Sequence, residues 1–245
     1  MPLPLLIALQ FLTRLPVSLP GMPPPDEQGR SLLYYPLVGG LLGGLLWLAS
    51  LGLADTPALL GAALLLSLWV LLSGALHLDG LGDCVDAWVG GYGERERTLA
   101  IMKDPRCGPM AVVALCLLLL LKCAALSVLL PAGQGVAVLL AVWLARSLLP
   151  LLFYCTPYVR AEGLGAALSR HLPRQTVPYL LAVQAGLCLL FGWAGVYALL
   201  AALGCFYLAR RAMLQRLGGC TGDCAGALVE LAELAILLVL ALALG

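Results

Sequence analysis

Charged side chains are scarce in this chain: Asp, Glu, Lys and Arg make up 11% of its 245 residues. Soluble domains carry about 25% charged residues, and disordered chains usually combine few apolar residues with a high net charge. The scarcity of charge, with a net charge of only +1, therefore excludes a soluble globular domain and a disordered chain. The near-zero net charge also gives no electrostatic reason for nucleic-acid binding, and we expect no nucleic-acid partner.

C-x-x-C pairs are missing too, although the chain has 9 cysteines. Zinc sites built from cysteine commonly contain a C-x-x-C pair, so this absence argues against zinc. Five cysteines lie in or next to apolar segments, and the other four lie near the side of the membrane that we predict to be cytoplasmic. Because disulfides are rare in the cytoplasm, we expect the cysteines to be reduced.

Apolar residues dominate instead, at 62% of the sequence. A bilayer core requires about 20 apolar residues of helix. Five stretches meet this length, and the stretch 177–209 is too long for one span, with a break at Gly192-Trp193-Ala194-Gly195 that predicts two short helices. We predict an all-α, polytopic membrane helix bundle of about seven spans, with six as the alternative, in a single domain that covers residues 1–245. The five single stretches are 32–54, 57–78, 109–131, 135–154 and 225–244.

The apolar residues 3–19 form a shorter segment, which Arg14 and two prolines interrupt. No basic residues precede it, which disfavours a secretory signal, so we expect an interfacial or re-entrant segment. Within the first span, Gly39-Gly40 and Gly43-Gly44 lie one turn apart and predict close helix packing.

Basic residues predict the orientation in the membrane. With seven spans, 12 of the 14 Lys and Arg residues fall in loops on one side, and the loops on the other side carry none. The positive-inside rule makes the basic side cytoplasmic. The two exceptions lie inside spans: Arg146 requires a function or a buried ion pair there, whereas Lys122 could snorkel or form an ion pair.

Acidic residues are concentrated in two segments at the ends of spans. In the first, His77-Leu-Asp79-Gly-Leu-Gly-Asp83-Cys-Val-Asp86, the three aspartates fall within about a 60° arc of one helix face. Like charges at this spacing repel each other, and desolvation at a membrane boundary adds to the cost. Since no cluster of lysines lies between the aspartates, we predict a divalent metal ion there.

The second acidic segment opens the last apolar stretch. If a helix begins near Thr221, then Asp223, Glu230 and Glu233 share one face within about an 80° arc, and Gly226 leaves space beside them. Carboxylate oxygens suit magnesium, manganese or calcium. Two acidic helix ends that face each other could hold one metal ion or a pair, as in phosphoryl-transfer enzymes. The basic residues around them could bind phosphates.

These segments, together with Phe11-Leu-Thr-Arg14-Leu-Pro16, closely resemble the cobalamin synthase family of membrane enzymes in residues, order and spacing. The resemblance extends from about residue 10 to residue 233. The segments that carry it are His77–Asp86, Ile101–Gly108, Pro157–Gly165 and Gly218–Gly226, followed by Glu230 and Glu233.

The resemblance implies a reaction, a cofactor and a location. A ribose hydroxyl of α-ribazole, or of its 5′-phosphate, attacks the cobinamide-linked phosphate of adenosylcobinamide-GDP; GMP leaves, and adenosylcobalamin or its 5′-phosphate forms. Magnesium is the implied cofactor, the enzyme lies in the bilayer of the bacterial inner membrane, and its active site faces the cytoplasm. Because many membrane phosphotransferases are dimers, the oligomer that we expect is a homodimer.

The resemblance also implies roles for individual residues. The implied metal ligands are Asp79, Asp83, Asp86 and Asp223. Glu230 and Glu233 either complete the metal shell or, for one of them, act as general base, and His77 is either a partner of the metal ligands or structural. The implied substrate-binding residues are Lys103, Asp104, Arg106, Arg146, Arg160, Gly218, Gly219, Thr221 and Gly222.

Two other classes share some of these features. A CDP-alcohol phosphotransferase acting on lipids uses comparable metal chemistry, but its D-x-x-D-G-x-x-A-R pattern is absent from this sequence. An ion-coupled transporter would also place acids inside the membrane, but transporters commonly show internal repeats with broken helices in corresponding positions, and the sequence shows neither.

Overall fold

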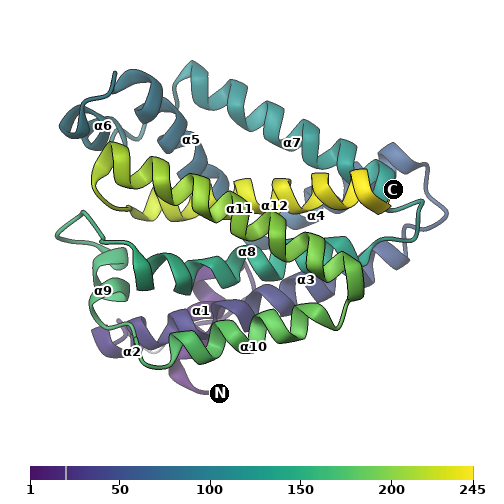
Figure 1. Ribbon diagram of the computed structural model, residues 1–245, viewed down its shortest axis with the longest axis horizontal. Coiled ribbons are helices and arrows are strands. Elements are labelled where there is room, and N and C mark those ends of the chain that lie inside the picture. Colours follow the sequence, from purple (N-terminus) through teal and green to yellow (C-terminus); the bar gives the residue numbers. More distant parts are fainter. Residues whose placement is uncertain (20, 245) are drawn as a thin grey trace.

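The computed structural model describes residues 1–19 and 21–244, which fold into a bundle of α-helices (Figure 1). Outside the helices, the described chain has one isolated parallel β-bridge, between Tyr158 and Cys220. The all-α fold predicted from the apolar stretches is confirmed. The helices are α1 (Leu3–Leu12), α2 (Pro25–Ser31), the 3-10 helix η1 (Leu32–Tyr34), α3 (Tyr35–Leu51), α4 (Ala58–Ser73), α5 (Leu76–Gly90), α6 (Arg95–Ile101), α7 (Pro109–Leu129), α8 (Val136–Cys155), α9 (Leu164–Arg170), α10 (Val177–Leu189), α11 (Gly192–Leu217) and α12 (Gly222–Leu244).

Five helical segments are long and apolar enough to cross a membrane: the continuous helix Pro25–Leu51, α7, α8, α11 and α12. The bent pair of α4 and α5 makes a sixth when it is counted as one broken span. α10 is apolar as well, but its 13 residues extend only about 20 Å, less than the bilayer core. The molecule is therefore a polytopic membrane bundle with five or six helical segments of spanning length, and the shorter α10 would make the seventh predicted span.

The predicted division of the stretch 177–209 is present, but in a different place. α10 ends before residues 190–191, and α11 begins at Gly192, whose positive φ of 61° reverses the chain. α11 then continues to Leu217, so only the first of the two helices is short. The apolar stretch 177–209 ends before α11 does, because the last turns of α11 carry arginines.

The predicted span 57–78 is not continuous, because α4 and α5 meet at an angle of 90°. Gly74 and Ala75 adopt left-handed backbone conformations at the bend, with φ of 69° and 56°. The backbone N–H of Arg14 donates to the carbonyl oxygen of Leu72 at 2.8 Å, so the segment after α1 satisfies a carbonyl at the end of α4. The bend separates the acidic helix α5 from the apolar helix α4.

Glycines allow α3 to pack closely against α8. A Cβ atom on Gly43 would lie 2.9 Å from the carbonyl oxygen of Leu139, and one on Gly39 would lie 3.0 Å from Cβ of Arg146. The close packing predicted from the glycine pairs is thus confirmed at these two positions, whereas Gly44 has open space around it. α8 is thereby held in the centre of the bundle, where it also contacts α11 and α12.

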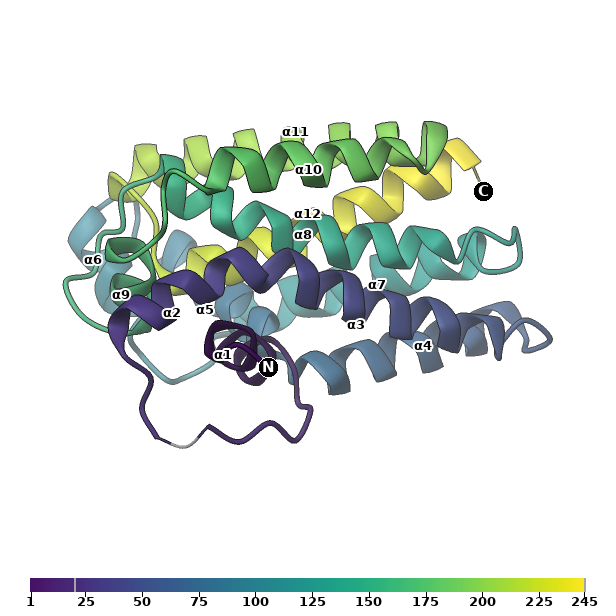
Figure 2. The same cartoon turned by 90° about the horizontal axis from the view of Figure 1, so that it is seen from below.

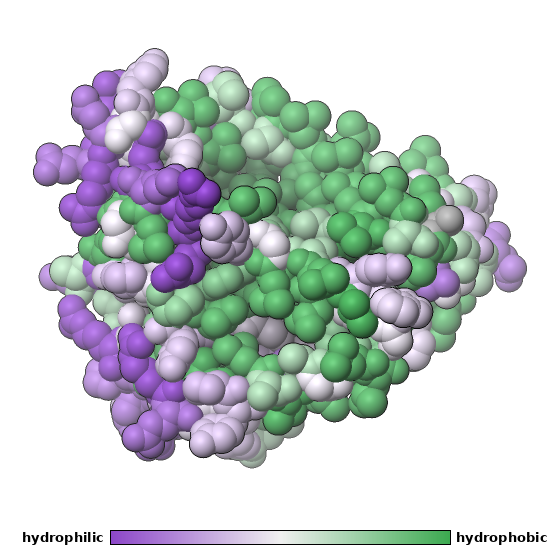
Figure 3. Space-filling model, viewed as in Figure 1, coloured by the Kyte–Doolittle hydropathy of each residue, from purple (hydrophilic) through white to green (hydrophobic). Residues whose placement is uncertain are grey.

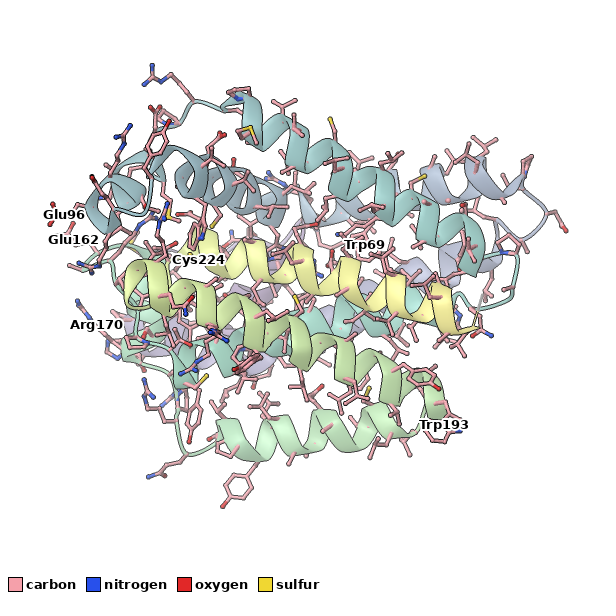
Figure 4. All side chains as sticks on the ribbon, turned by 45° about the horizontal axis from the view of Figure 1, so that its top comes forward. Trp69, Glu96, Glu162, Arg170, Trp193 and Cys224 are labelled. Carbon is pink, nitrogen blue, oxygen red and sulfur yellow. The ribbon has the colours of Figure 1, made fainter. Side chains whose placement is uncertain are left out.

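The two ends of the bundle differ in chemistry. Hydrophilic residues gather at the end where α6 and α9 lie, which we call the polar end, and hydrophobic residues cover the middle of the molecule (Figures 1 and 3). Glu96, Glu162 and Arg170 lie at the polar end in Figure 4, and Trp193 lies at the opposite end. Trp193 is 71% exposed, as is typical of tryptophan at a membrane–water interface.

The N-terminal helix α1 does not run along the bundle. Figure 2 shows α1 almost end-on while the long helices lie in the plane of the view. Its buried residues, among them Ala8 and Leu12, face the interior, and the helix contacts α2 and α3. With 10 residues it matches the short, non-spanning segment predicted from the sequence.

Candidate active site

The two acidic segments meet where α5 crosses α12. A Cβ atom on Gly80 would lie 2.9 Å from the carbonyl oxygen of Asp223, and one on Gly226 would lie 3.3 Å from Cα of His77. The backbones come this close because neither crossing residue carries a side chain. α5 therefore fills the space that Gly226 was predicted to leave open, and the crossing brings Asp79 to the same cavity as Asp223.

A cavity of about 290 Å³ lies beside this crossing, and we call it the carboxylate cavity. Asp79 and Asp223 line it, together with Arg160 and Glu162 from the loop between α8 and α9. Figure 4 shows Glu162 at the polar end of the bundle, on the same side as Cys224 in the first turn of α12. Five glycines also line the cavity and leave it open: Gly80, Gly163, Gly165, Gly222 and Gly226.

Arg160 is held beside Asp223 by pairing of two loops. The N–H of Cys220 donates to the carbonyl oxygen of Pro157 at 2.8 Å, and the N–H of Val159 donates to the carbonyl oxygen of Cys220 at 3.0 Å. Nη2 of Arg160 then donates to Oδ2 of Asp223 at 2.6 Å. Nε of Arg160 is buried without a hydrogen-bond partner in the described residues. Such a free guanidinium N–H in a cavity is suited to a phosphate oxygen.

The two remaining aspartates of α5 have different environments. Asp83 is half-buried and interacts electrostatically with Asp79 and Asp223. Asp86 accepts the backbone N–H groups of Gly108 at 2.5 Å and Ala111 at 2.9 Å. Its carboxylate thus caps the N-terminus of α7, where the helix dipole favours a negative charge. Asp86 attaches α7 to α5, and its predicted role as a metal ligand stays a prediction.

The oxygen donors of the cavity suit a magnesium ion that is shared with substrate. Within residues 1–19 and 21–244, no group of three or more His, Cys, Asp or Glu side chains is arranged so that it could hold a metal ion. Magnesium commonly binds through one or two carboxylates and takes its other ligands from water and substrate phosphates. Asp79 and Asp223, which both line the cavity, provide an open pair of this kind.

The basic loop before α7 lies outside the carboxylate cavity. Lys103 and Arg106 are exposed, and Nη2 of Arg106 lies 2.6 Å from Oδ2 of Asp104. The guanidinium of Arg106 lowers the pKa of Asp104 to about 2. Lys103, Asp104 and Arg106 do not line the carboxylate cavity, and their predicted contact with substrate stays a prediction.

Packing explains most of the glycine-rich segment before α12. Gly218 ends α11 with a positive φ of 73°, and Gly219 lies against the carbonyl group of Pro157, where a side chain would collide. Thr221 is buried, and its hydroxyl accepts a backbone N–H from the first turn of α12 at 3.2 Å. Of the four predicted substrate-binding residues in this segment, only Gly222 lines the cavity.

Glu230 and Glu233 belong to a buried ion-pair network next to the cavity. Lys122 of α7 forms ion pairs with both, at 2.6 Å to Oε2 of Glu230, and Arg146 of α8 pairs with Glu233. The four side chains are at most 7% exposed. Nη2 of Arg146 also lies 3.5 Å from Nδ1 of His77, which lines the carboxylate cavity. Two cations and two anions therefore balance each other within the bundle.

This network bears on several predicted roles. The sequence left Arg146 with either a function or a buried ion pair, and the structure shows the ion pair. None of Arg146, Glu230 and Glu233 lines the cavity, so their roles as substrate, metal or base residues stay predictions. The sequence left the role of Lys122 open, and only the arrangement of three helices shows its two partners.

Sequence reasoning did not assign several residues that line the cavity. Glu162 and Tyr158 lie within a motif that was noted for its arginine, and Phe11 and Tyr35 come from α1 and α3. Glu162, Tyr158 and Phe11 lie within segments that the sequence motifs identified. No local pattern, however, distinguishes a residue that lines a cavity from one that is buried in the core.

Taken together, the fold and this site define a polytopic membrane protein with an acidic, arginine-containing cavity suited to phosphate chemistry at its polar end. Comparison with known proteins specifies the family. The model of the family described as cobalamin-5-phosphate synthase matches residues 4–241. The chain therefore belongs to the cobalamin-5-phosphate synthase family.

Curated relatives resemble the chain over nearly its whole length. A protein of Ectopseudomonas mendocina (strain ymp) is 66% identical over 97% of this chain and 98% of its own. Proteins of Pseudomonas aeruginosa (strain PAO1) and Pseudomonas putida (strain KT2440) are 62% and 61% identical, over 97% and 99% of this chain and 97% and 100% of their own. All three are named adenosylcobinamide-GDP ribazoletransferase. No solved structure matches the chain.

Proposed function

We propose that the protein is an adenosylcobinamide-GDP ribazoletransferase that closes the nucleotide loop of adenosylcobalamin. The family match over residues 4–241 carries this proposal, and the carboxylate cavity supports it. A ribose hydroxyl oxygen of α-ribazole, or of its 5′-phosphate, forms a bond to the phosphorus that bears the cobinamide. The bond from this phosphorus to the bridging oxygen breaks, and GMP leaves with that oxygen.

The charges of the cavity suit the pyrophosphate of this donor. Magnesium bound by Asp79 and Asp223 would supply the positive charge that neutralises the reacting phosphates. Arg160 lines the cavity and contributes a guanidinium that uses one N–H on Asp223 and has further N–H groups for a phosphate oxygen. Catalysis of this kind depends mainly on positioning and on charge stabilisation.

The proton of the attacking hydroxyl needs an acceptor in the cavity. Asp79 and Glu162 line the cavity, and neither forms an ion pair in the described part of the chain. Glu230 and Glu233 are paired with Lys122 and Arg146 deeper in the bundle. Because Asp79 is assigned to the metal ion, we assign proton transfer to Glu162.

The membrane and its sidedness are part of the proposal. The apolar helices indicate a membrane protein, and we place it in the bacterial inner membrane. Because the basic loops lie on one side, the positive-inside rule places the polar end and the carboxylate cavity at the cytoplasm. Both substrates then enter from the aqueous side on which the cavity lies.

The test is GMP release by purified protein in liposomes that receive magnesium, adenosylcobinamide-GDP and α-ribazole. We expect release that requires both substrates and stops when EDTA removes the metal. Asp223→Asn should lower the rate by orders of magnitude while the protein stays folded, whereas Asp55→Asn, in an exposed loop away from the cavity, should leave it unchanged. If the wild-type protein released no GMP over a range of metal and substrate concentrations, the proposal would be wrong.

A further inference from the structure

A second cavity of about 510 Å³, which we call the α1 cavity, lies next to the carboxylate cavity and shares five lining residues with it. The lining of the α1 cavity contains no charged residue, and its side chains with polar groups are Gln10, Gln28 and Tyr35. The residues that line both cavities are Phe11, Tyr35, Gly163, Leu164 and Leu168. The charged residues of the carboxylate cavity therefore lie at one end of the combined space, and an apolar, aromatic chamber lies at the other.

The junction of the two cavities has a fixed aromatic wall. Phe11 and Tyr35 are stacked, with ring centroids 6.1 Å apart and an interplanar angle of 24°. Tyr35 is 2% exposed and is held in the core, whereas Phe11 is half-buried and has exposed surface at the junction. A ring placed in this way can stack on a planar aromatic ligand without rearrangement.

A ligand that fits the combined space carries phosphate or ribose at one end and an apolar aromatic ring at the other. Guanine fits the α1 cavity poorly, because its polar edge requires several hydrogen-bond partners and unpaired polar groups are costly when buried. Of the two glutamines, Gln28 already donates to the carbonyl oxygen of Pro23 at 2.8 Å. The dimethylbenzimidazole of α-ribazole presents two methyl groups at its outer edge, and its one free ring nitrogen is a single hydrogen-bond acceptor.

We infer that the α1 cavity binds the aromatic base of the nucleoside acceptor, with Phe11 stacked on the base and the ribose directed toward the carboxylates. The inference rests on the proposed function and extends it to one substrate. It gives the short helix α1 a part in substrate binding, since α1 supplies Phe11 and closes the apolar chamber with α2 and α9 (Figure 2). The donor pyrophosphate then occupies the charged end, where Arg160 and the aspartates lie.

The experiment measures KM separately for α-ribazole and for adenosylcobinamide-GDP in Phe11→Ala, Phe11→Tyr and wild-type protein. Loss of one aromatic stack should raise the KM for α-ribazole by roughly 5- to 100-fold in Phe11→Ala, with the donor KM within about two-fold of wild type. Phe11→Tyr keeps the ring and should restore acceptor binding. Phe191→Ala is the matched control, because Phe191 packs on Trp143 and lines neither cavity.

A binding titration of α-ribazole alone keeps the inference separate from turnover. The dissociation constant should rise by a similar factor in Phe11→Ala, and removal of the two methyl groups from the base should weaken binding to the wild type. A rise in the donor KM in place of the acceptor KM, or no change in either, would overturn the inference. A wild-type protein that binds α-ribazole but releases no GMP would instead contradict the proposed function.

Discussion

At the scale of single residues, Arg160 shows how one side chain serves both the fold and the site. Its ion pair with Asp223 joins the loop after α8 to α12, and Arg160 also lines the carboxylate cavity. Arg160→Lys keeps the charge but loses the planar fork, so we expect kcat/KM to fall about 10- to 100-fold, as for loss of a charged hydrogen bond. Steady-state kinetics of GMP release measure this effect.

The control for this variant is Arg211→Lys, because Arg211 is exposed on α11 and forms no ion pair among the described residues. No loss in Arg160→Lys would mean that Arg160 acts only through its charge, and equal losses in the two variants would mean that the guanidinium of Arg160 has no specific role.

The buried network leads to a prediction about stability. Lys122→Met removes one cation and leaves Glu230 without its partner in the apolar interior. Breaking a buried pair in this way costs about 3–5 kcal/mol. We expect a clear fall in Tm, which thermal unfolding of the detergent-solubilised protein measures. Adding Glu230→Gln should recover part of the loss, because the second change removes the unpaired charge.

Two results would contradict a structural role for the network. One is a Lys122→Met protein with wild-type Tm, and the other is a double variant less stable than the sum of the two single losses.

At the scale of helices, the crossing of α5 and α12 decides whether the aspartates meet. Gly80→Ala would place a methyl group 2.9 Å from the backbone of Asp223, so one helix must move. We expect lower Tm and a large loss of activity together. Gly204→Ala is the matched control: Gly204 lies in α11 with open space around it, so alanine should be neutral or stabilise the helix by up to about 1 kcal/mol. Normal activity in Gly80→Ala would show that activity does not depend on the close approach of α5 and α12.

The helices also show what the sequence can and cannot predict. Apolar runs predicted where most helices lie, since burial in lipid requires such runs. The prediction that Asp79, Asp83 and Asp86 share one helix is also confirmed, because all three lie in α5. The 90° bend between α4 and α5 was missed because hydropathy is continuous across Gly74. The partners of Lys122 depend on the register of three helices, which no local pattern encodes.

At the scale of the whole molecule, the polar end combines the cavity, the basic loops and the short helices, while the opposite end carries few charges (Figure 3). This asymmetry matches a protein whose water-soluble substrates arrive from one side only. The homodimer expected for this class stays a prediction, since a single chain contains every residue of the carboxylate cavity described here.

The arrangement of α12 allows this sidedness to be tested without reference to the number of spans. α12 begins at the polar end with Asp223 beside the cavity, and the chain ends at the opposite end of the bundle (Figure 1). Since the positive-inside rule places the polar end in the cytoplasm, the C-terminus must face the periplasm. Alkaline phosphatase fused after residue 245 should therefore be active, and a fusion in the loop 91–94, next to α6 at the polar end, should be inactive. An active loop fusion with an inactive C-terminal fusion would reverse the orientation and place the carboxylate cavity outside the cytoplasm, whereas two inactive fusions would mean that α12 does not cross the membrane.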